Sequence, residues 1–276
     1  MQQADTRYGV RVRYITFATA LASDPLIIAA QLRLPTVTDR QPAVVILHGS
    51  AGVDTRGTYH AEALNEAGIA TLEPDLWSPR ALLGGTGPNG RPQSVAETVP
   101  DAFGALNYLA ARSDIDARRI GVMGFSWGGV LAMLTATRPY CERYLKPGAP
   151  RFAAHAPFYP VCWTYNTVPG HEFTELTGAP VFIQSGERDD YDQPDTCERL
   201  IRGLPAAARR CVTCKIYPDA THAFDRLGTP LAGDDPYSHL GKGGQITIAP
   251  NPGAAAAARR AMVAFFQRAF TAVGVQ

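Results

Sequence analysis

Residues 120–128 read Ile-Gly-Val-Met-Gly-Phe-Ser-Trp-Gly, and this stretch decides the fold. A short apolar run leads into a Gly-x-Ser-x-Gly pentapeptide centred on Ser126, and an apolar helical pattern follows. This context is typical of a nucleophile elbow, a sharp strand-to-helix turn that exposes a serine hydroxyl above a sheet. Side chains two positions from the serine would collide in such a turn, which explains the glycines at positions 124 and 128.

The composition is that of an ordinary globular protein. The 276 residues are 46% apolar and 18% charged, with a formal net charge of +1. The chain is long enough for one large α/β domain and shows no linker, so we expect a single domain over residues 1–276. No basic run indicates nucleic acid as a partner, and no apolar stretch approaches the length of a membrane span.

Strand and helix patterns alternate along the chain. Continuous β-branched runs such as residues 43–47 indicate strands that are buried on both faces of a parallel sheet. The predicted strands are 8–17, 26–34, 43–47, 69–72, 119–123, 152–158, 181–184 and 212–217, and the predicted helices are 59–67, 95–112, 127–137, 196–204 and 254–272. This order predicts a doubly wound, mostly parallel eight-stranded sheet flanked by helices. Two long polar segments, 84–92 and 225–250, are expected to form irregular loops at a functional rim.

A serine hydroxyl needs a base to take its proton, and in this architecture an acid and then a histidine follow the serine along the chain. Asp189 follows the strand at 181–184, and His222 follows the strand at 212–217. Both positions are carboxyl ends of parallel strands, where open α/β sheets bind ligands. We therefore predict Ser126 as the nucleophile, His222 as the general base and Asp189 as the orienting acid.

Other acids and histidines compete for these roles. Asp190, Asp192 and Glu187 are alternatives for the acid, because all three lie in the same acidic loop. Among the other histidines, His48 is expected to shape the loop that it precedes, and His155 is expected to lie in the core or at the rim.

The oxyanion of a tetrahedral intermediate needs two backbone N–H donors. One is expected from Trp127, directly after the nucleophile, and the other from the loop at 48–52, where Ser50 is favoured and Ala51 is the alternative. Several aromatic residues are candidates for a substrate pocket, although core packing is the commoner fate of such side chains. They are Trp77, Phe125, Tyr159 and Trp163.

The sequence predicts neither a metal site nor a cofactor. Cys211-x-x-Cys214 stands alone, and an offset of three within a strand puts its cysteines on opposite faces. The glycine-rich loop at 48–52 lacks the Gly-Lys-Ser/Thr ending of a phosphate loop, and no dinucleotide fingerprint occurs.

The other cysteines bear on the compartment. Cys162 and Cys197 both fall near the predicted active-site rim, and a bridge between them would favour an oxidising compartment. Five free and mostly buried thiols are the alternative. The sequence contains no signal peptide, so a cytoplasmic chain and a mature exported (periplasmic or secreted) chain both remain open.

Four stretches together resemble the dienelactone hydrolase family of the α/β-hydrolase superfamily. They are His48-Gly49-Ser50-Ala51-Gly52-Val53, Gly121-Val122-Met123-Gly124-Phe125-Ser126-Trp127-Gly128-Gly129, Gly186-Glu187-Arg188-Asp189-Asp190 and Tyr217-Pro218-Asp219-Ala220-Thr221-His222-Ala223-Phe224. The resemblance implies an α/β-hydrolase fold without a large lid domain, and cleavage of an ester or lactone through an acyl-enzyme without a cofactor. One departure is the nucleophile: archetypal members of this family carry cysteine, whereas this chain has Ser126, which suits general carboxylesterase chemistry.

The leading interpretation is a serine carboxylic-ester hydrolase that acts on small or medium esters or lactones. Its partner is then a small-molecule substrate. A serine peptidase on the same fold and a non-catalytic ligand-binding homologue are the alternatives; loss of a triad member would indicate the latter, and all three are present. The sequence leaves open the natural acyl and alcohol groups, the preference between ester and lactone, and the oligomeric state.

Overall fold

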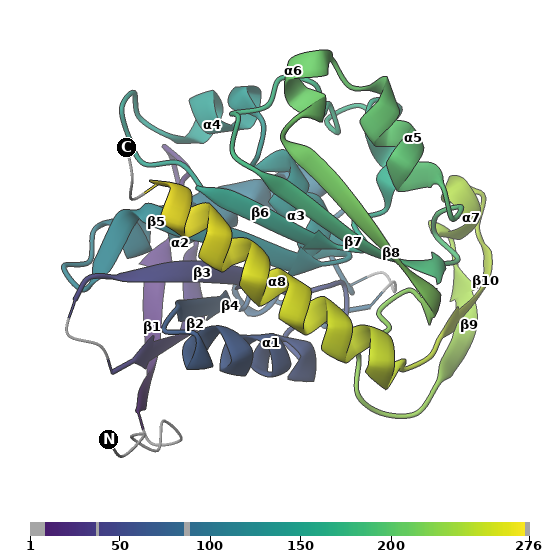
Figure 1. The fold of residues 1–276 in the computed structure, drawn as a ribbon, viewed down its shortest axis with the longest axis horizontal. Helices are drawn as coiled ribbons and strands as arrows, with labels where there is room; N and C mark the ends of the chain where they lie inside the picture. Colours follow the sequence, from purple (N-terminus) through teal and green to yellow (C-terminus); the bar gives the residue numbers. More distant parts are fainter. Residues whose placement is uncertain (1–8, 37–38, 86–88, 274–276) are drawn as a thin grey trace.

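The core of the protein is a twisted eight-stranded sheet, seen in a computed structural model that describes residues 9–36, 39–85 and 89–273. The strand order is β1-β2-β4-β3-β5-β6-β7-β8 (Figure 1). The strands are β1 (Val10–Ala18), β2 (Ile27–Pro35), β3 (Gln41–Leu47), β4 (Ala70–Pro74), β5 (Ile115–Phe125), β6 (Ala154–Phe158), β7 (Val181–Arg188) and β8 (Val212–Thr221). β1 pairs with β2 and β2 with β4 in antiparallel fashion, and every later pair is parallel. The predicted mostly parallel, eight-stranded sheet is confirmed.

Helices cover both faces of this sheet. They are α1 (Thr55–Glu66), α2 (Val99–Ala110), α3 (Trp127–Leu134), α4 (Arg138–Tyr144), α5 (Thr196–Gly203), α6 (Ala206–Arg209), α7 (Ser238–Gly241) and α8 (Pro252–Val273), with short 3-10 turns η2 (Ser78–Arg80), η3 (Val95–Glu97) and η4 (Cys162–Thr164). α1 and α8 lie along one face (Figure 1), and α2 and α3 pack on the other.

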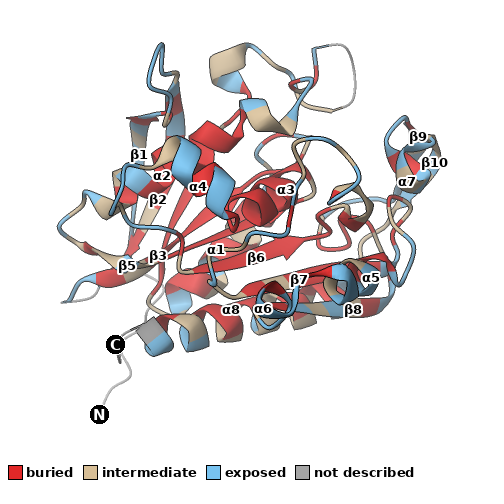
Figure 2. Cartoon of the chain, turned by 90° about the horizontal axis from the view of Figure 1, so that it is seen from above, coloured by how far each residue is buried: buried red, intermediate tan, exposed pale blue. Residues whose placement is uncertain are grey.

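The buried strand β3 shows why two layers of helices are needed. Val44 and Ile46 join the apolar cluster under α1 and α8, whereas Ala43, Val45 and Leu47 join the cluster under α2 and α3. Successive side chains of a strand point to opposite faces, so a strand that is apolar at every position needs cover on both. Figure 2 shows β6, most of β3 and the second half of β5 buried.

The segment 225–250 differs from its prediction. It is not an irregular loop, because β9 (Leu231–Asp235) and β10 (Gly244–Ile248) form an antiparallel hairpin with α7 between them. β9 reads Leu-Ala-Gly-Asp-Asp, without a β-branched residue, and so carried no strand signal. The hairpin projects from the end of the molecule beside α5 and β8 (Figures 1 and 2).

Several helices also differ from the predictions: α1 begins at Thr55 rather than at residue 59, and α3 ends at Leu134 rather than at residue 137. The helix expected at 95–112 divides into η3 and α2, because Pro100 occupies the first turn of a new helix. α4 was not predicted, and it likewise starts with a proline, Pro139, in its first turn. In the predicted loop 84–92, residues 86–88 lie outside the described residues.

None of the helices that the structure describes is both long and apolar enough to cross a membrane.

Candidate active site

Ser126 lies at the turn between β5 and α3. Its backbone has φ 50° and ψ −108°, a conformation that L-residues rarely adopt. Its N–H donates to the Phe158 carbonyl at the end of β6, at 3.0 Å. A Cβ at Gly128 would collide with the backbone of Leu47 in β3, and one at Gly124 would collide with Gly128 itself. Both glycines are therefore required for α3 to start this close to the sheet.

Three of the predicted side chains meet at the carboxyl edge of the sheet. The His222 Nε2 atom lies 2.9 Å from the Ser126 Oγ atom, and the His222 Nδ1 atom lies 2.8 Å from the Asp189 Oδ2 atom. Asp189 directly follows β7 and His222 directly follows β8. Both are buried, whereas Ser126 is half-buried. The arrangement allows a proton to pass from the serine to an imidazole that a carboxylate holds in one tautomer.

The other acids of the same loop have separate partners. Asp189 accepts the N–H of Tyr191 at 2.9 Å, which turns its second oxygen toward His222. Asp190 accepts a backbone N–H of β10, Asp192 accepts two N–H groups of η4, and Glu187 accepts a backbone N–H of β8. Asp189 is thus the acid of this loop that contacts the imidazole.

The loop after β3 is held beside the serine by several bonds. The Ser50 hydroxyl accepts a hydrogen bond from Arg91 at 2.7 Å, and the Ser50 carbonyl accepts from the Trp77 indole at 3.1 Å and from the Gly85 N–H at 2.6 Å. Among the hydrogen bonds formed by the described residues, none uses the N–H of Ser50 or of Trp127. These two N–H groups remain available to a ligand.

The His48 side chain also stabilises this loop by hydrogen bonds. Its Nδ1 atom lies 2.8 Å from the Gly49 carbonyl, and its Nε2 atom accepts the N–H of Leu76 at 3.0 Å. Burial lowers the pKa of His48 to about 4, so the ring is neutral and donates through Nδ1. His155 is also buried, with a pKa lowered to about 4 by burial, and its Nδ1 atom lies 3.0 Å from the Ala132 carbonyl. Both histidines therefore have the structural environments expected from the sequence.

A cavity of about 600 Å³ opens above the serine. Trp127 and Trp163 lie in its wall, together with side chains of the β9–β10 hairpin such as Leu231 and Ile246. The predicted pocket residues Trp77, Phe125 and Tyr159 are not among those that line it, which corrects the prediction. All three are buried in the core instead, where Trp77 packs edge-on against Trp127 and the Phe125 ring stacks on that of Tyr159.

Charged groups of both signs line the cavity. They are Arg56, Arg91 and Arg226, and Asp234 and Asp235. The Arg91 guanidinium lies 4.3 Å from the centre of the Tyr237 ring and 5.4 Å from that of Trp127, which orients it by cation–π contact.

A buried hydrogen-bond network lies beneath the site, and no sequence motif indicates it. The Tyr159 hydroxyl donates to Asp225 at 2.6 Å, Arg56 donates to the Tyr159 oxygen at 3.3 Å, and His60 Nε2 lies 2.8 Å from Asp225. Hydrogen bonds and charge from His60, followed by the charge of Arg56, outweigh burial and lower the pKa of Asp225. Asp225 is three residues after His222, so the network fixes the segment that carries this histidine.

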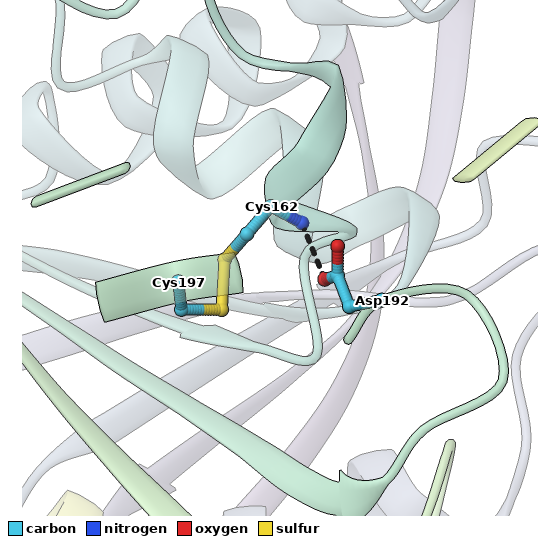
Figure 3. A group of neighbouring side chains, drawn as sticks. All are labelled: Cys162, Asp192 and Cys197. Atoms are coloured by element: carbon cyan, nitrogen blue, oxygen red, sulfur yellow. Dashed lines mark hydrogen bonds between the residues drawn. A yellow bond between two sulfur atoms is a disulfide. The ribbon is translucent and has the colours of Figure 1, made fainter. Parts of the chain in front are cut away.

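A disulfide joins Cys162 in η4 to Cys197 in α5, with the Cα atoms 5.1 Å apart. The alternative of five free thiols is therefore wrong. Asp192 lies beside the bridge, and its carboxylate accepts the N–H of Cys162 (Figure 3). It also accepts the N–H of Trp163. Two cysteines and an acid at this spacing could hold a metal ion, but here the sulfur atoms are bonded to each other.

The profile of the dienelactone hydrolase family matches residues 28–270. The chain belongs to this family. Membership supports a hydrolase that acts on ester or lactone bonds, and the resemblance seen in the sequence is confirmed.

The individual proteins that this chain resembles share only a modest sequence identity with it. A probable 2-oxo-3-(5-oxofuran-2-ylidene)propanoate lactonase of a Bradyrhizobium species is 26% identical over 71% of this chain and 78% of its own length. An uncharacterised protein of Mycobacterium tuberculosis is 31% identical over 62% of this chain, and the match spans 60% of that protein.

Solved structures show the same fold. A dienelactone hydrolase-like promiscuous phosphotriesterase from metagenomic libraries superposes with a TM-score of 0.63 at 19% identity, over 94% of this chain and 98% of that one. An esterase of Pyrobaculum calidifontis gives a TM-score of 0.56 at 20% identity, over 78% of each chain.

Proposed function

We propose that this protein is a serine hydrolase that cleaves small or medium carboxylic esters or lactones through an acyl-enzyme. One observation carries the proposal: an unbroken chain of hydrogen bonds runs from the Ser126 hydroxyl through His222 to Asp189, and it opens into the cavity. A hydroxyl becomes a useful nucleophile at neutral pH when a positioned base takes its proton.

Each step has a group to perform it. The His222 Nε2 atom takes the Ser126 proton while Oγ forms a bond to the carbonyl carbon, and Asp189 stabilises the resulting imidazolium. The N–H groups of Ser50 and Trp127 donate to the oxyanion. As the tetrahedral intermediate collapses, the bond to the leaving oxygen breaks and His222 protonates that oxygen. Water then attacks the acyl group by the same route, which releases the acid and restores the serine.

The cavity supports a substrate that carries an anionic group. Arg91 and Arg226 bring two guanidinium groups to its wall, and a guanidinium binds a carboxylate through paired hydrogen bonds. The Bradyrhizobium relative is named as a lactonase of a propanoate, which is such a substrate. We therefore propose esters or lactones with a free carboxylate as the preferred class.

Trapping of the nucleophile tests the proposal. A fluorophosphonate probe is expected to add once, at Ser126, and p-nitrophenyl acetate is expected to give a burst of one p-nitrophenol per protein molecule. Ser126→Ala should show neither, with an unchanged far-ultraviolet spectrum as the control for folding. A wild-type protein without burst or adduct would refute the proposal.

The acid is tested by a matched pair of neighbours. Asp189→Asn is expected to lower kcat by about 10⁴, the effect of the wrong imidazole tautomer in a serine triad. Asp190→Asn changes the next residue, whose carboxylate bonds to β10 and not to the imidazole. If Asp190→Asn were the more damaging change, the assignment of the acid would be wrong.

A further inference from the structure

Two tyrosine rings pack on the His222 imidazole, and we call Tyr159 and Tyr191 the tyrosine pair. The centre of the Tyr191 ring lies 4.3 Å from that of the imidazole, and the centre of the Tyr159 ring lies 4.7 Å from it. The pair comes from different elements, since Tyr159 follows β6 and Tyr191 lies in the acidic loop after β7.

Each ring is itself fixed by a buried carboxylate. The Tyr159 hydroxyl donates to Asp225 and the Tyr191 hydroxyl donates to Asp235, each at 2.6 Å. Both carboxylates are almost inaccessible to solvent, with 1% and 4% of Asp225 and Asp235 exposed. Burial, together with these carboxylates, raises the pKa of both hydroxyls, so both remain protonated donors.

Both carboxylates are anchored in turn. Asp225 also binds His60 of α1, whereas Asp235 accepts the Tyr237 N–H within the β9–β10 hairpin. The Tyr191 N–H donates to Asp189, so Tyr191 contacts both the acid and the base of the site.

We propose that Tyr159 and Tyr191 are positioning residues that hold the His222 imidazole in the orientation that joins Ser126 to Asp189. The two hydrogen bonds of the imidazole direct its ring nitrogens but leave the ring free to tilt about the line between them. Rings that are packed on the imidazole, and that cannot themselves turn, remove this freedom. The inference rests on the proposed function, in which His222 is the general base.

The effect should appear in kcat rather than in KM, because a misplaced base slows the chemical steps without removing a substrate contact. A misplacement of about 1 Å costs about 100-fold in rate. Tyr159→Leu and Tyr191→Leu are therefore expected to lower kcat by about 100-fold, and the Phe variants, which keep the ring but lose its anchor, by a smaller factor. KM should stay within about twofold in the Tyr159 variants, whereas Tyr191 lines the cavity and its variants are judged by kcat and by the resonance of the imidazole.

Tyr217 provides a matched control. It is buried, and its hydroxyl donates to Gln184 at 2.6 Å, but it does not pack on the imidazole. Tyr217→Phe therefore removes an equally short, buried hydrogen bond and should leave kcat unchanged.

Proton NMR supplies a readout that does not depend on turnover. The His222 N–H that is bonded to Asp189 should give a far-downfield resonance in the wild type and in Tyr217→Phe, broadened or lost in the Leu variants. Wild-type kcat and an intact resonance in both Leu variants would overturn the proposal, as would an equal loss of kcat in Tyr217→Phe. A wild type that lacks the Ser126 adduct would instead refute the proposed function.

Discussion

The disulfide between Cys162 and Cys197 gives a quantitative prediction about stability. It links η4, in the wall of the cavity, to α5, which follows the acidic loop, across 35 residues of sequence. Both cysteines are buried. Reduction of the bond adds only two hydrogen atoms, so its effect isolates the contribution of the cross-link from that of the side chains.

The magnitude follows from the length of the closed loop. A cross-link over about 35 residues removes about 13 cal/mol/K of entropy from the unfolded chain, which corresponds to about 4 kcal/mol at 25 °C. Reduction is therefore expected to lower the free energy of unfolding by about 4 kcal/mol, and the thermal midpoint by about 7 °C for a chain of this size. KM should rise as well, because Trp163 and Thr164 in η4 line the cavity.

Thiol titration and denaturant unfolding check this expectation together. Untreated protein in denaturant should show three free thiols, from Cys141, Cys211 and Cys214, and reduced protein should show five. The Cys162→Ala/Cys197→Ala double variant should unfold at the same denaturant concentration with and without reductant, and Cys211→Ala should behave as the wild type does. Five thiols in the untreated protein, or equal stability of the oxidised and reduced forms, would refute the reasoning.

Three other changes test separate parts of the structure. Burial raises the pKa of Glu73 to about 7, above its usual value of 4.5, so ionisation of this group destabilises the fold as pH rises from about 4.5 to 7. Glu73→Gln should therefore gain about 2 to 3 kcal/mol over the wild type in urea unfolding between pH 5 and pH 8, and a gain that falls over this range would contradict the assignment. Gly128→Ala should abolish the p-nitrophenyl acetate burst, since its Cβ would meet the Leu47 carbonyl, and a normal burst would show that α3 can shift. Arg226→Gln should raise KM about tenfold for a carboxylate-bearing ester and leave KM for its neutral methyl ester unchanged, which steady-state kinetics on the two esters would decide.

The parts of the site that the sequence predicted are those with local signals. Ser126 lies between two glycines at the end of an apolar run, and Asp189 and His222 each follow a strand that its own β-branched residues identify. Their convergence follows from topology, because the carboxyl ends of parallel strands meet at one edge of a sheet. The order of the strands alone therefore predicts that these three side chains meet, and no knowledge of contacts between distant residues is needed.

The predictions for most of the pocket residues and for the 225–250 segment were wrong, because tertiary contacts decide where these residues lie. Phe125 ends β5 and Tyr159 directly follows β6, much as Asp189 follows β7, and nothing in their sequence neighbours distinguishes a core position from a pocket position. The hairpin at 231–248 was missed for a related reason. Its strands are held by partners elsewhere in the chain, such as the Asp190 carboxylate that accepts the Thr247 N–H, and β9 has no β-branched residue that would indicate a strand.

The contacts around His222 are likewise made by residues that are distant in the sequence, and so no local pattern indicates them. The imidazole is oriented by Tyr159 and Tyr191. The Tyr191 ring depends on Asp235, and the Tyr159 ring depends on Asp225 and, through it, on His60, which precedes Asp225 by 165 residues. Asp225 can be buried as an anion because His60 and Tyr159 both donate to it, and either donor alone would leave a carboxylate oxygen unsatisfied in the core. A single substitution at any member of this network therefore costs more than one hydrogen bond, because the remaining members are left buried with unpaired polar groups.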